Sequence, residues 1–532
     1  MATVFLLFCS YGPIIHNYQA ALTGKFYFGQ SDYPLDMLGD LAYVEEGISG
    51  QTLASFNYST LLGSHPSIVK IEYIAIGLAG RLLGISSLSA FLWGRLVISL
   101  AVLAAIYLVI RSVFTTSFLR VTSYLLVLFG AGIILPGAVN HFAGYDQQVF
   151  TRLTQAMPHY LLGAGATVVS LYFLARTLEA PKRTVFFYLS LLSGVVASLV
   201  YAPDTVLLIS GFPLYILFDM LSSMVTSGRV RINLHRIGIL FTYAGVTLIP
   251  ILYVRYITTT AWSDIRTAHM ETLFPFYIPF AEYFTVVGMT YVLSLIAVPS
   301  VLRKGKPFFL LLATWLVMHP VGEYFISPIL HLNYFRYFLT PYYVAFGILA
   351  TQGAVVASAW IRRRIPKIPE RRAAVAIILF TLLTGIGTYI SVWRMEYVCY
   401  CVAPPLDFAY PKKSVMDGIF ALRQYTRPDD IVLSTYFAGT LIPAFAGNRV
   451  YVSWWYSLID PPEAAVTDAD LTAFYGEAMT SAEAHAFLKR EHISYVFYSD
   501  QEQILTPGDK HLDYPFLVVK YDKDGTIIYN VP

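Results

Sequence analysis

The sequence has 532 residues, of which 56% are hydrophobic, 16% are aromatic and only 13% are charged; its formal net charge is +3. Soluble globular domains carry about 25% charged residues, so this composition excludes that class and indicates a protein that crosses a membrane several times. The small net charge gives no reason to expect a nucleic acid as partner. Three cysteines are too few for a disulfide framework or a four-cysteine zinc site.

Apolar stretches long enough to span a bilayer recur about eleven times along the chain. They predict a mainly α-helical, polytopic membrane protein with about eleven transmembrane helices. The predicted spans cover residues 2–18, 87–110, 121–139, 158–175, 184–201, 204–224, 237–256, 280–302, 307–327, 338–360 and 373–393.

The basic residues between these spans predict an orientation. Every second connection is rich in Lys and Arg, most clearly the one that holds Arg362, Arg363 and Arg364. Cytoplasmic loops are enriched in such residues, so we expect these connections to face the cytoplasm. This pattern predicts a multi-pass protein of the plasma membrane, with a cytoplasmic N-terminus and with everything after Trp393 outside the cell.

The first predicted outer loop, about residues 23–84, is unusually acidic. Asp32, Asp36 and Asp40 recur at a spacing of four, which would place them on one face of a helix. Like charges at that spacing repel, so local helix stability does not explain them. Such carboxylates could act as a general base on a hydroxyl, or could hold a divalent cation such as Mg²⁺ or Mn²⁺. Simple solvation of an outer loop remains the alternative for each single aspartate.

The end of this loop has a different character. Residues 67–84 are apolar but include Lys70, Glu72 and Arg81, and the stretch is short for a span. These features predict a helix that lies in the membrane interface.

Further polar residues are predicted to face the same compartment. Ionisable groups at membrane depth are costly and are functional candidates by default. Glu323 and Arg336 bracket one outer loop, and Arg336 suits either a phosphate or a lipid headgroup. The full set of predicted substrate-binding residues is His65, Asp146, Arg152, His159, Arg255, Arg266, Glu323 and Arg336.

The last 120 residues or so have a sequence pattern typical of a soluble domain. Helix-like stretches alternate with short apolar runs, and Asp522-Lys523-Asp524-Gly525 between two of these runs signals a hairpin. We predict a membrane module at 1–393, a linker at 394–411 and a small α/β extracytoplasmic domain at 412–532. This last segment has no G-x-G-x-x-G or P-loop motif, so we assign it no nucleotide.

Several short motifs together resemble the glycosyltransferase C (GT-C) superfamily, which includes protein mannosyltransferases and bacterial lipid A aminoarabinose transferases. The resemblance starts with the acidic first outer loop and its His-Pro before LAGRLLGIS. It continues with the arginine of SAFLWGRLVISL, Ala156-Met157-Pro158-His159 and Asn333-Tyr-Phe-Arg336, and ends with TYFAGTLIPAFAGNRVYVSWWY and EHISYVFYS.

This resemblance implies a fold, a reaction and its partners. It implies a polyprenyl-phosphate-sugar donor among the membrane lipids, and a glycan, lipid or protein acceptor at the outer face, in a role at the cell envelope. It also implies that Asp36 or Asp32 is the catalytic base or a metal ligand. Asp40 stands where many bacterial relatives have His, which leaves the assignment among the three open. No Trp-Trp-Asp motif is present, which disfavours transfer of a whole oligosaccharide.

Two other functions fit a polytopic protein of this composition. One is a transporter or flippase, whose signature would be paired broken helices and charges near the middle of the bilayer. The other is a catalytically inactive GT-C-like scaffold for cell-envelope assembly.

Overall fold

The computed structural model describes most of the chain, and its contacts divide the chain into two compact units. The described residues are 2–20, 24–29, 34–55, 57–58, 66–133, 157–180, 183–258, 278–330, 335–390, 408–454, 461–506, 508 and 511–532. The first unit, here the membrane unit, comprises Met1–Pro13, Leu96–Val254 and Phe274–Val398. The second, here the α/β unit, comprises Ile14–Arg95, Arg255–Leu273 and Cys399–Pro532.

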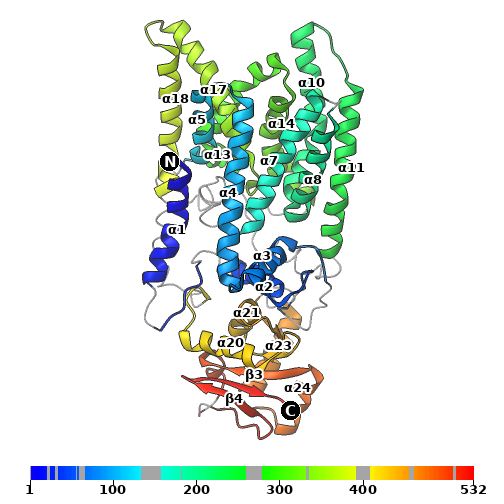
Figure 1. The fold of residues 1–532 in the computed structure, drawn as a ribbon, viewed down its shortest axis with the longest axis vertical. Coiled ribbons are helices and arrows are strands. Elements are labelled where there is room, and N and C mark those ends of the chain that lie inside the picture. Colours follow the sequence, from blue (N-terminus) through cyan, green and yellow to red (C-terminus); the bar gives the residue numbers. More distant parts are fainter. Residues whose placement is uncertain are drawn as a thin grey trace. The chain divides into compact units, whose positions relative to one another are not determined.

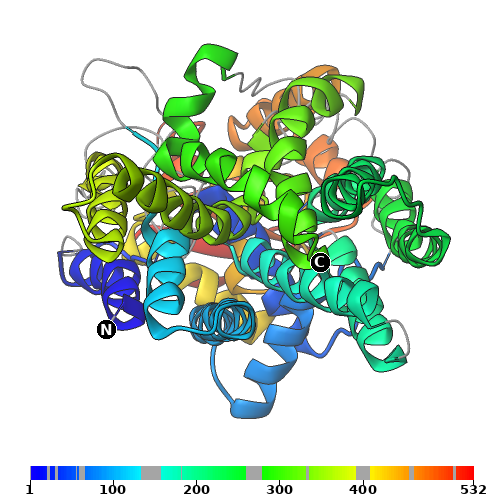
Figure 2. The ribbon, with the colours of Figure 1, turned by 90° about the horizontal axis from the view of Figure 1, so that it is seen from above.

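The membrane unit is built of helices that run alongside one another, and Figure 2 shows them closer to end-on than Figure 1. Helices α1 (Ala2–Ala20), α4 (Ser87–Val113) and α11 (Leu234–Tyr256) contribute residues to both units. The other helices of the membrane unit are α5 (Ser117–Phe129), α7 (Pro158–Glu179), α8 (Thr184–Val200), α9 (Ala202–Ser210), α10 (Phe212–Ser227), α13 (Phe280–Lys304), α14 (Pro307–Val321), the π-helical turn η2 (Gly322–Ile326), α15 (Ser327–Leu330), α16 (Phe335–Phe338), α17 (Tyr342–Arg364) and α18 (Glu370–Thr384).

Within the described ranges, eight helical stretches are long and apolar enough to cross a membrane. They are Ser87–Val113, Pro158–Glu179, Ala202–Ser227, Leu234–Tyr256, Phe280–Lys304, Pro307–Leu330, Tyr342–Arg364 and Glu370–Ile390. The predicted spans 2–18 and 184–201 match the helices α1 and α8, and the predicted span 121–139 shares residues 121–129 with α5, while residues 134–139 lie outside the described ranges. The chain is therefore a mainly α-helical, polytopic membrane protein, as predicted.

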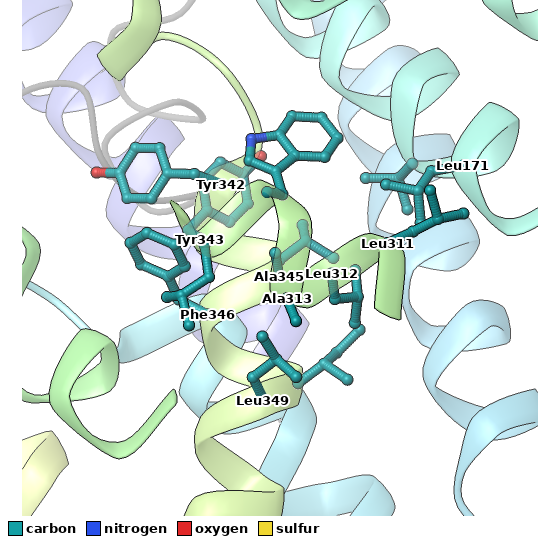
Figure 3. Close-up of a cluster of buried hydrophobic side chains, with 14 of the residues drawn as sticks. Leu171, Leu311, Leu312, Ala313, Tyr342, Tyr343, Ala345, Phe346 and Leu349 are labelled. Atoms are coloured by element: carbon teal, nitrogen blue, oxygen red, sulfur yellow. The ribbon is translucent and has the colours of Figure 1, made fainter. Parts of the chain in front are cut away.

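The core of the membrane unit packs around α14 and α17. Almost every side chain of α14 is buried, because the helix is apolar on all sides. Figure 3 shows Leu312 and Ala313 of α14 beside Ala345 of α17, all members of one core cluster. Small residues let the helices approach closely: a Cβ added at Gly353 of α17 would overlap the carbonyl oxygen of Leu293. Lipid tails are as apolar as the side chains, so the hydrophobic effect does not drive helices together inside a membrane, and they associate by close packing at small residues instead.

The α/β unit contains a five-stranded sheet and the helices of the acidic loop. Its elements are α2 (Pro34–Ser49), α3 (Ile71–Leu83), α20 (Lys413–Tyr425), β1 (Ile431–Leu433), α21 (Tyr436–Phe445), β2 (Arg449–Val450), α23 (Pro461–Tyr475), α24 (Ser481–Arg490), β3 (Ile493–Tyr498), α25 (Asp500–Gln503), β4 (Val518–Lys523) and β5 (Thr526–Asn530). The strand order is β2-β1-β3-β5-β4, with β1 parallel to β2 and β3. The predicted small α/β domain is thus present.

The predicted hairpin is also confirmed. Strands β4 and β5 pair antiparallel, and Asp524 and Gly525 between them both have positive φ angles, 52° and 78°. Two successive positive φ angles are what a tight hairpin turn requires, which is why Asp-Gly is a strong signal.

A buried carboxylate ties the ends of the two central parallel strands together. Glu502 of α25 accepts hydrogen bonds from the backbone N–H and hydroxyl of Thr435, which follows β1. Its second oxygen accepts from the backbone N–H and hydroxyl of Ser499, which follows β3. Because Thr435 is the N-cap of α21, a carboxylate of the chain itself occupies this helix N-terminus.

The acidic loop and the C-terminal segment are packed together within the α/β unit. Arg423 of α20 pairs with Glu45 of α2 at 2.6 Å, and Ser87 at the start of α4 donates a hydrogen bond to the carbonyl of Ala444. The ring of Phe26 contacts the rings of α20 and α21. The domain boundaries given above stay a prediction, but residues 412–532 share this unit with residues 14–95.

Candidate functional site

The acidic residues that the sequence singled out lie on α2. Pro34 opens this helix, where its fixed φ is favourable, and Asp36 lies in the first turn, where a carboxylate complements the helix dipole. Asp36 is exposed, whereas Asp40, one turn later, is only 5% exposed. The helix that the spacing of four requires is therefore present for these two residues. Asp32 lies outside the described residues.

Asp40 is held by two partners from the start of α3. Lys70 contacts one carboxylate oxygen through its Nζ at 3.0 Å, and Tyr73 donates a hydrogen bond from its hydroxyl to the other at 2.7 Å. Lys70 itself has a left-handed backbone (φ 68°), which is uncommon for a residue with a side chain. The ammonium of Lys70 also lies 5.3 Å from the ring centroid of Tyr73. Asp40 is thus a positioned, paired carboxylate.

The two helices reach this geometry because they cross at glycines. A Cβ at Gly47 of α2 would overlap the carbonyl oxygen of Ile74, and one at Gly77 of α3 would overlap that of Val44. The backbones are therefore in direct contact at the crossing, which fixes the position of α3 relative to Asp40. The stretch predicted as an interfacial helix is helical from Ile71 to Leu83, and Leu82 and Leu83 at its end are exposed.

Three further buried carboxylates, which sequence reasoning missed, lie on α2 and α3. Burial raises the pKa of Glu46 to about 8, although the backbone N–H of Ser55 donates a hydrogen bond to it at 2.8 Å. Burial raises the pKa of Glu72 to about 7, against the opposing effect of Lys70. Burial also raises the pKa of Glu45, and its partner Arg423 opposes that shift. The available signal for Glu45 and Glu46 was the apolar sequence around them, Leu41-Ala42-Tyr43-Val44 before and Ile48 after, which indicates that this later part of α2 is buried.

A second group of predicted residues meets in the membrane unit around Tyr201. The ring of His159, at the start of α7, lies 3.9 Å from that of Tyr160 and 6.5 Å from that of Tyr201. Tyr201 also donates a hydrogen bond from its hydroxyl to the backbone carbonyl of Arg336 at 2.8 Å. Residues far apart in the sequence, 159 and 336, therefore share one neighbour.

Two buried acids lie close to this group. Asp204 of α9 is fully buried and accepts a hydrogen bond from Thr167 at 3.1 Å. Glu323 lies in η2 and is also fully buried. The glycine before it, Gly322, packs against Leu207 of α9 and the ring of Tyr337 of α16. Glu323 was expected from the sequence to bind substrate, while Asp204 was not among the predicted site residues.

The remaining predicted residues are dispersed or undescribed. Arg255 lies in the last turn of α11 and is exposed. The predictions for His65, Asp146, Arg152 and Arg266 concern residues outside the described ranges.

A divalent cation was predicted as one use of the acidic loop. Among the described residues, no group of three or more His, Cys, Asp or Glu side chains is gathered as a metal ion requires. Asp36 and Asp40 alone do not make such a donor set. We therefore derive no reaction step through a metal.

Comparison with known proteins places the whole chain among solved membrane structures. No protein-family model matches the sequence, and no curated protein matches it. Among the solved structures that are similar in fold are two different proteins. The oligosaccharyltransferase of Archaeoglobus fulgidus, tethered to an acceptor peptide, has a TM-score of 0.54 and 11% identity, over 94% of this chain and 68% of that one. ArnT from Cupriavidus metallidurans, bound to undecaprenyl phosphate, has a TM-score of 0.51 and 10% identity, over 99% and 98%.

The chain has the GT-C fold. This confirms, at the level of fold, the resemblance drawn from short sequence motifs. A further structure of the archaeal enzyme, AglB, was solved with an inhibitory peptide and a dolichol-phosphate, and has a TM-score of 0.51 and 13% identity, over 100% of this chain and 74% of that one. Another structure of that enzyme contains zinc and sulfate. At these identities the likeness concerns the GT-C fold and not the substrate.

Proposed function

We propose that this protein is a membrane glycosyltransferase that moves one sugar from a polyprenyl-phosphate donor to an acceptor at the outer face of the membrane. The observation that supports it best is the GT-C fold over 99% of the chain, shared with a protein solved bound to undecaprenyl phosphate. The buried ion pair and close helix crossing that hold α2 in place add to it. The proposal keeps the predicted orientation, with a cytoplasmic N-terminus and an extracytoplasmic α/β domain.

In this reaction the acceptor hydroxyl attacks the anomeric carbon of the donor. The bond from that carbon to the phosphate oxygen breaks, the lipid phosphate leaves with the electron pair, and a base takes the hydroxyl proton. We assign the base to Asp36, because a general base must reach the acceptor and Asp36 is exposed in the first turn of α2. Asp40 is buried against Lys70 and Tyr73, so we assign it the role of holding α2 and α3 in position.

The leaving phosphate needs a cation to stabilise its charge. A guanidinium group suits this role, since it can bind phosphate oxygens through two parallel hydrogen bonds. Arg336 is the first candidate, with Arg255 and the undescribed Arg152 and Arg266 as alternatives. A leaving group that is already ionised requires no acid, so positioning and charge complementarity can supply much of the rate.

The decisive variant is Asp36→Asn, which keeps the size of the side chain but removes the proton acceptor. We expect turnover with a polyprenyl-phosphate sugar to fall by about 10²–10⁴-fold, while donor binding stays near the wild-type value. The measurement is transfer of a radiolabelled sugar by the purified full-length protein, with donor binding measured in parallel.

The matched control is Asp468→Asn, which removes an exposed carboxylate from another helix of the same unit and should leave turnover unchanged. Asp32→Asn is measured as well, because Asp32 is the alternative to Asp36 as the catalytic base. Full turnover in both Asp36→Asn and Asp32→Asn would contradict an aspartate base in this loop.

One observation favours the transporter as second candidate. Helix α13 is broken at Gly288, with φ 71° and ψ −171°, and α14 continues into the π-helical turn η2, which holds the buried Glu323. Adjacent discontinuous helices around a buried acid are a feature of transporters. Uptake of a lipid-phosphate sugar into vesicles by the Asp36→Asn variant, without transfer, would support that function over the transferase.

A further inference from the structure

The helix formed by α14, η2 and α15 carries a line of polar side chains through an otherwise apolar segment. Trp315, His319, Glu323 and Ser327 follow one another at a spacing of four, which places them along one side of the helix. Each is at most 4% exposed. The apolar core of the membrane unit does not require such a line, and each buried polar group in it is costly unless it has a partner.

The members of this line differ in what they contact. His319 has a partner at one ring nitrogen, because its Nδ1 lies 2.7 Å from the hydroxyl of Tyr283, whereas its Nε2 and the Nε1 of Trp315 make no hydrogen bond within the described residues. Glu323 has none in the described part of the chain: neither carboxylate oxygen makes a hydrogen bond, and no described ion pair includes it. The hydroxyl of Ser327 and that of the nearby Tyr337 are buried and equally lack a partner among the described residues.

Among the described membrane helices, a buried serine hydroxyl without a partner is uncommon, although Ser123 of α5 is a second case. Hydroxyl side chains in these helices generally donate a hydrogen bond to the carbonyl four residues earlier, as Thr314, Thr351 and Ser198 do. The corresponding carbonyl for Ser327 belongs to Glu323, in the π-helical turn. Single π-helical turns within α-helices occur frequently at functional sites.

Three oxygen-bearing groups are therefore brought close together without a hydrogen-bond partner in the described ranges. Glu323 and Ser327 are one turn apart on the same helix. Tyr337 is next to this turn, since a Cβ at Gly322 would lie 3.1 Å from its ring. If the three groups contacted one another directly, they would form hydrogen bonds, so a further donor is needed to satisfy them.

The surroundings favour a donor with positive charge. Tyr324, the residue after Glu323, packs its ring against Phe280 at 5.4 Å and Tyr283 at 6.0 Å. Aromatic rings attract cations through their faces, and a buried carboxylate does so more strongly. An ammonium group has three N–H donors, which match the carboxylate and two hydroxyl groups as acceptors.

We propose that Glu323, Ser327 and Tyr337 form a binding site for a primary ammonium group inside the membrane unit. The site does not depend on the proposed sugar transfer, because its evidence lies wholly in the unpaired groups of this unit. The ammonium group can come from an ethanolamine lipid headgroup or from a small water-soluble amine, and both present the same three donors.

The test uses the full-length protein in nanodiscs made only of phosphatidylglycerol, which carries no amine. n-Octylammonium is titrated while the thermal unfolding midpoint is recorded, with n-octanol as a neutral probe of the same chain length. Because a ligand of the folded state stabilises it, we expect octylammonium to raise the midpoint with saturation and octanol not to do so. In Glu323→Gln the half-saturating concentration should rise at least 10-fold.

Matched variants keep this experiment decisive. Glu282→Gln removes a half-buried carboxylate from the first turn of α13 and should bind octylammonium like the wild type. Ser327→Ala removes one acceptor and should weaken binding in the same direction as Glu323→Gln, so it serves if the latter does not fold. An equal response to octanol, or wild-type binding by both site variants, would overturn the proposal.

The same assay distinguishes a lipid headgroup from a soluble amine as the source of the ammonium group. If a lipid headgroup is the ligand, nanodiscs containing phosphatidylethanolamine should shift the octylammonium titration to higher concentration. If a soluble amine is the ligand, added ethanolamine should do so in phosphatidylglycerol nanodiscs, while phosphatidylethanolamine has no effect.

Discussion

Two buried carboxylates, Asp40 in the α/β unit and Glu323 in the membrane unit, show why burial alone does not reveal what a residue does. Asp40 is paired with Lys70 and Tyr73 at a helix crossing that the glycines of α2 and α3 make possible. Glu323 is equally buried and pairs with none of the described residues. The first carboxylate holds two helices of its unit together, whereas the second forms part of the proposed ammonium site. The two carboxylates differ in whether a described side chain pairs with them, and the sequence alone does not show this difference.

The largest effect on the Asp40 side should come from the helix crossing. Gly77→Ala places a Cβ against the carbonyl of Val44, a backbone atom that cannot move aside as a side chain would. We expect a loss of about 3 kcal/mol or more in the stability of α2 and α3, at the upper end of overpacking effects. Hydrogen exchange of the amides of these two helices measures this local stability directly.

The control for this substitution is a glycine with room around it. Gly238 lies within α11 and a Cβ there meets nothing within 4 Å, so Gly238→Ala should be neutral or stabilising by about 0.5–1 kcal/mol. If both variants behaved alike, the crossing would not be what positions Asp40.

A smaller effect should follow from removing the partner of Asp40. Lys70→Met removes the ammonium group from beside a buried carboxylate that keeps the hydroxyl of Tyr73, and should cost about 1.5–3 kcal/mol, the range for hydrogen bonds to charged groups. Adding Asp40→Asn should recover part of that loss, because the amide carries no charge to leave unpaired. Hydrogen exchange of α2 and α3 is again the measurement.

The comparison pair for Lys70 and Asp40 lies on the surface. The side chains of Arg176 and Glu179 are 40% and 28% exposed, so water screens the pair and Glu179→Gln should change stability by no more than about 0.5 kcal/mol. A Lys70→Met variant as stable as Glu179→Gln would mean that Asp40 is not anchored by this ion pair.

The smallest effect is a dependence on pH. The folded-state pKa of Glu46 is about 8, above its usual 4.5, so between these values the folded protein holds a proton that the unfolded chain releases. Stability should therefore fall as pH rises towards 8. Glu72, with a pKa of about 7, acts in the same direction but in a lower range. Between pH 7 and pH 8.5 the remaining decline belongs mainly to Glu46.

Glu46→Gln isolates this contribution, since its amide oxygen can still accept the hydrogen bond from Ser55. The variant should unfold at a higher temperature than the wild type at pH 8.5, by a smaller margin at pH 6, and at nearly the same temperature near pH 4.5, where the unfolded chain also begins to hold the proton. A constant difference between the two proteins across that range would show that the ionisation of Glu46 does not matter to folding.

The sequence by itself determined the membrane character, most of the helices, the α/β domain and the hairpin at Asp524-Gly525. These features depend on local signals: hydropathy over about twenty residues, periodicity, and the backbone preferences of a turn. It also predicted that Asp36 and Asp40 share a helix, which follows from spacing alone. The GT-C resemblance could be seen in the sequence for a related reason, because each of its motifs is a short continuous stretch of residues.

Only the tertiary structure decided which acids are paired. Lys70 meets Asp40 across thirty residues, Arg423 meets Glu45 from the other end of the chain, and Tyr201 joins His159 to Arg336. Such contacts depend on how helices cross. The crossing of α2 and α3 lies at glycines, and their role can be recognised only when the backbone that faces them is known. The same holds for Glu323, because its lack of a partner among the residues that the structure describes depends on all the elements packed around it and on no single stretch of sequence.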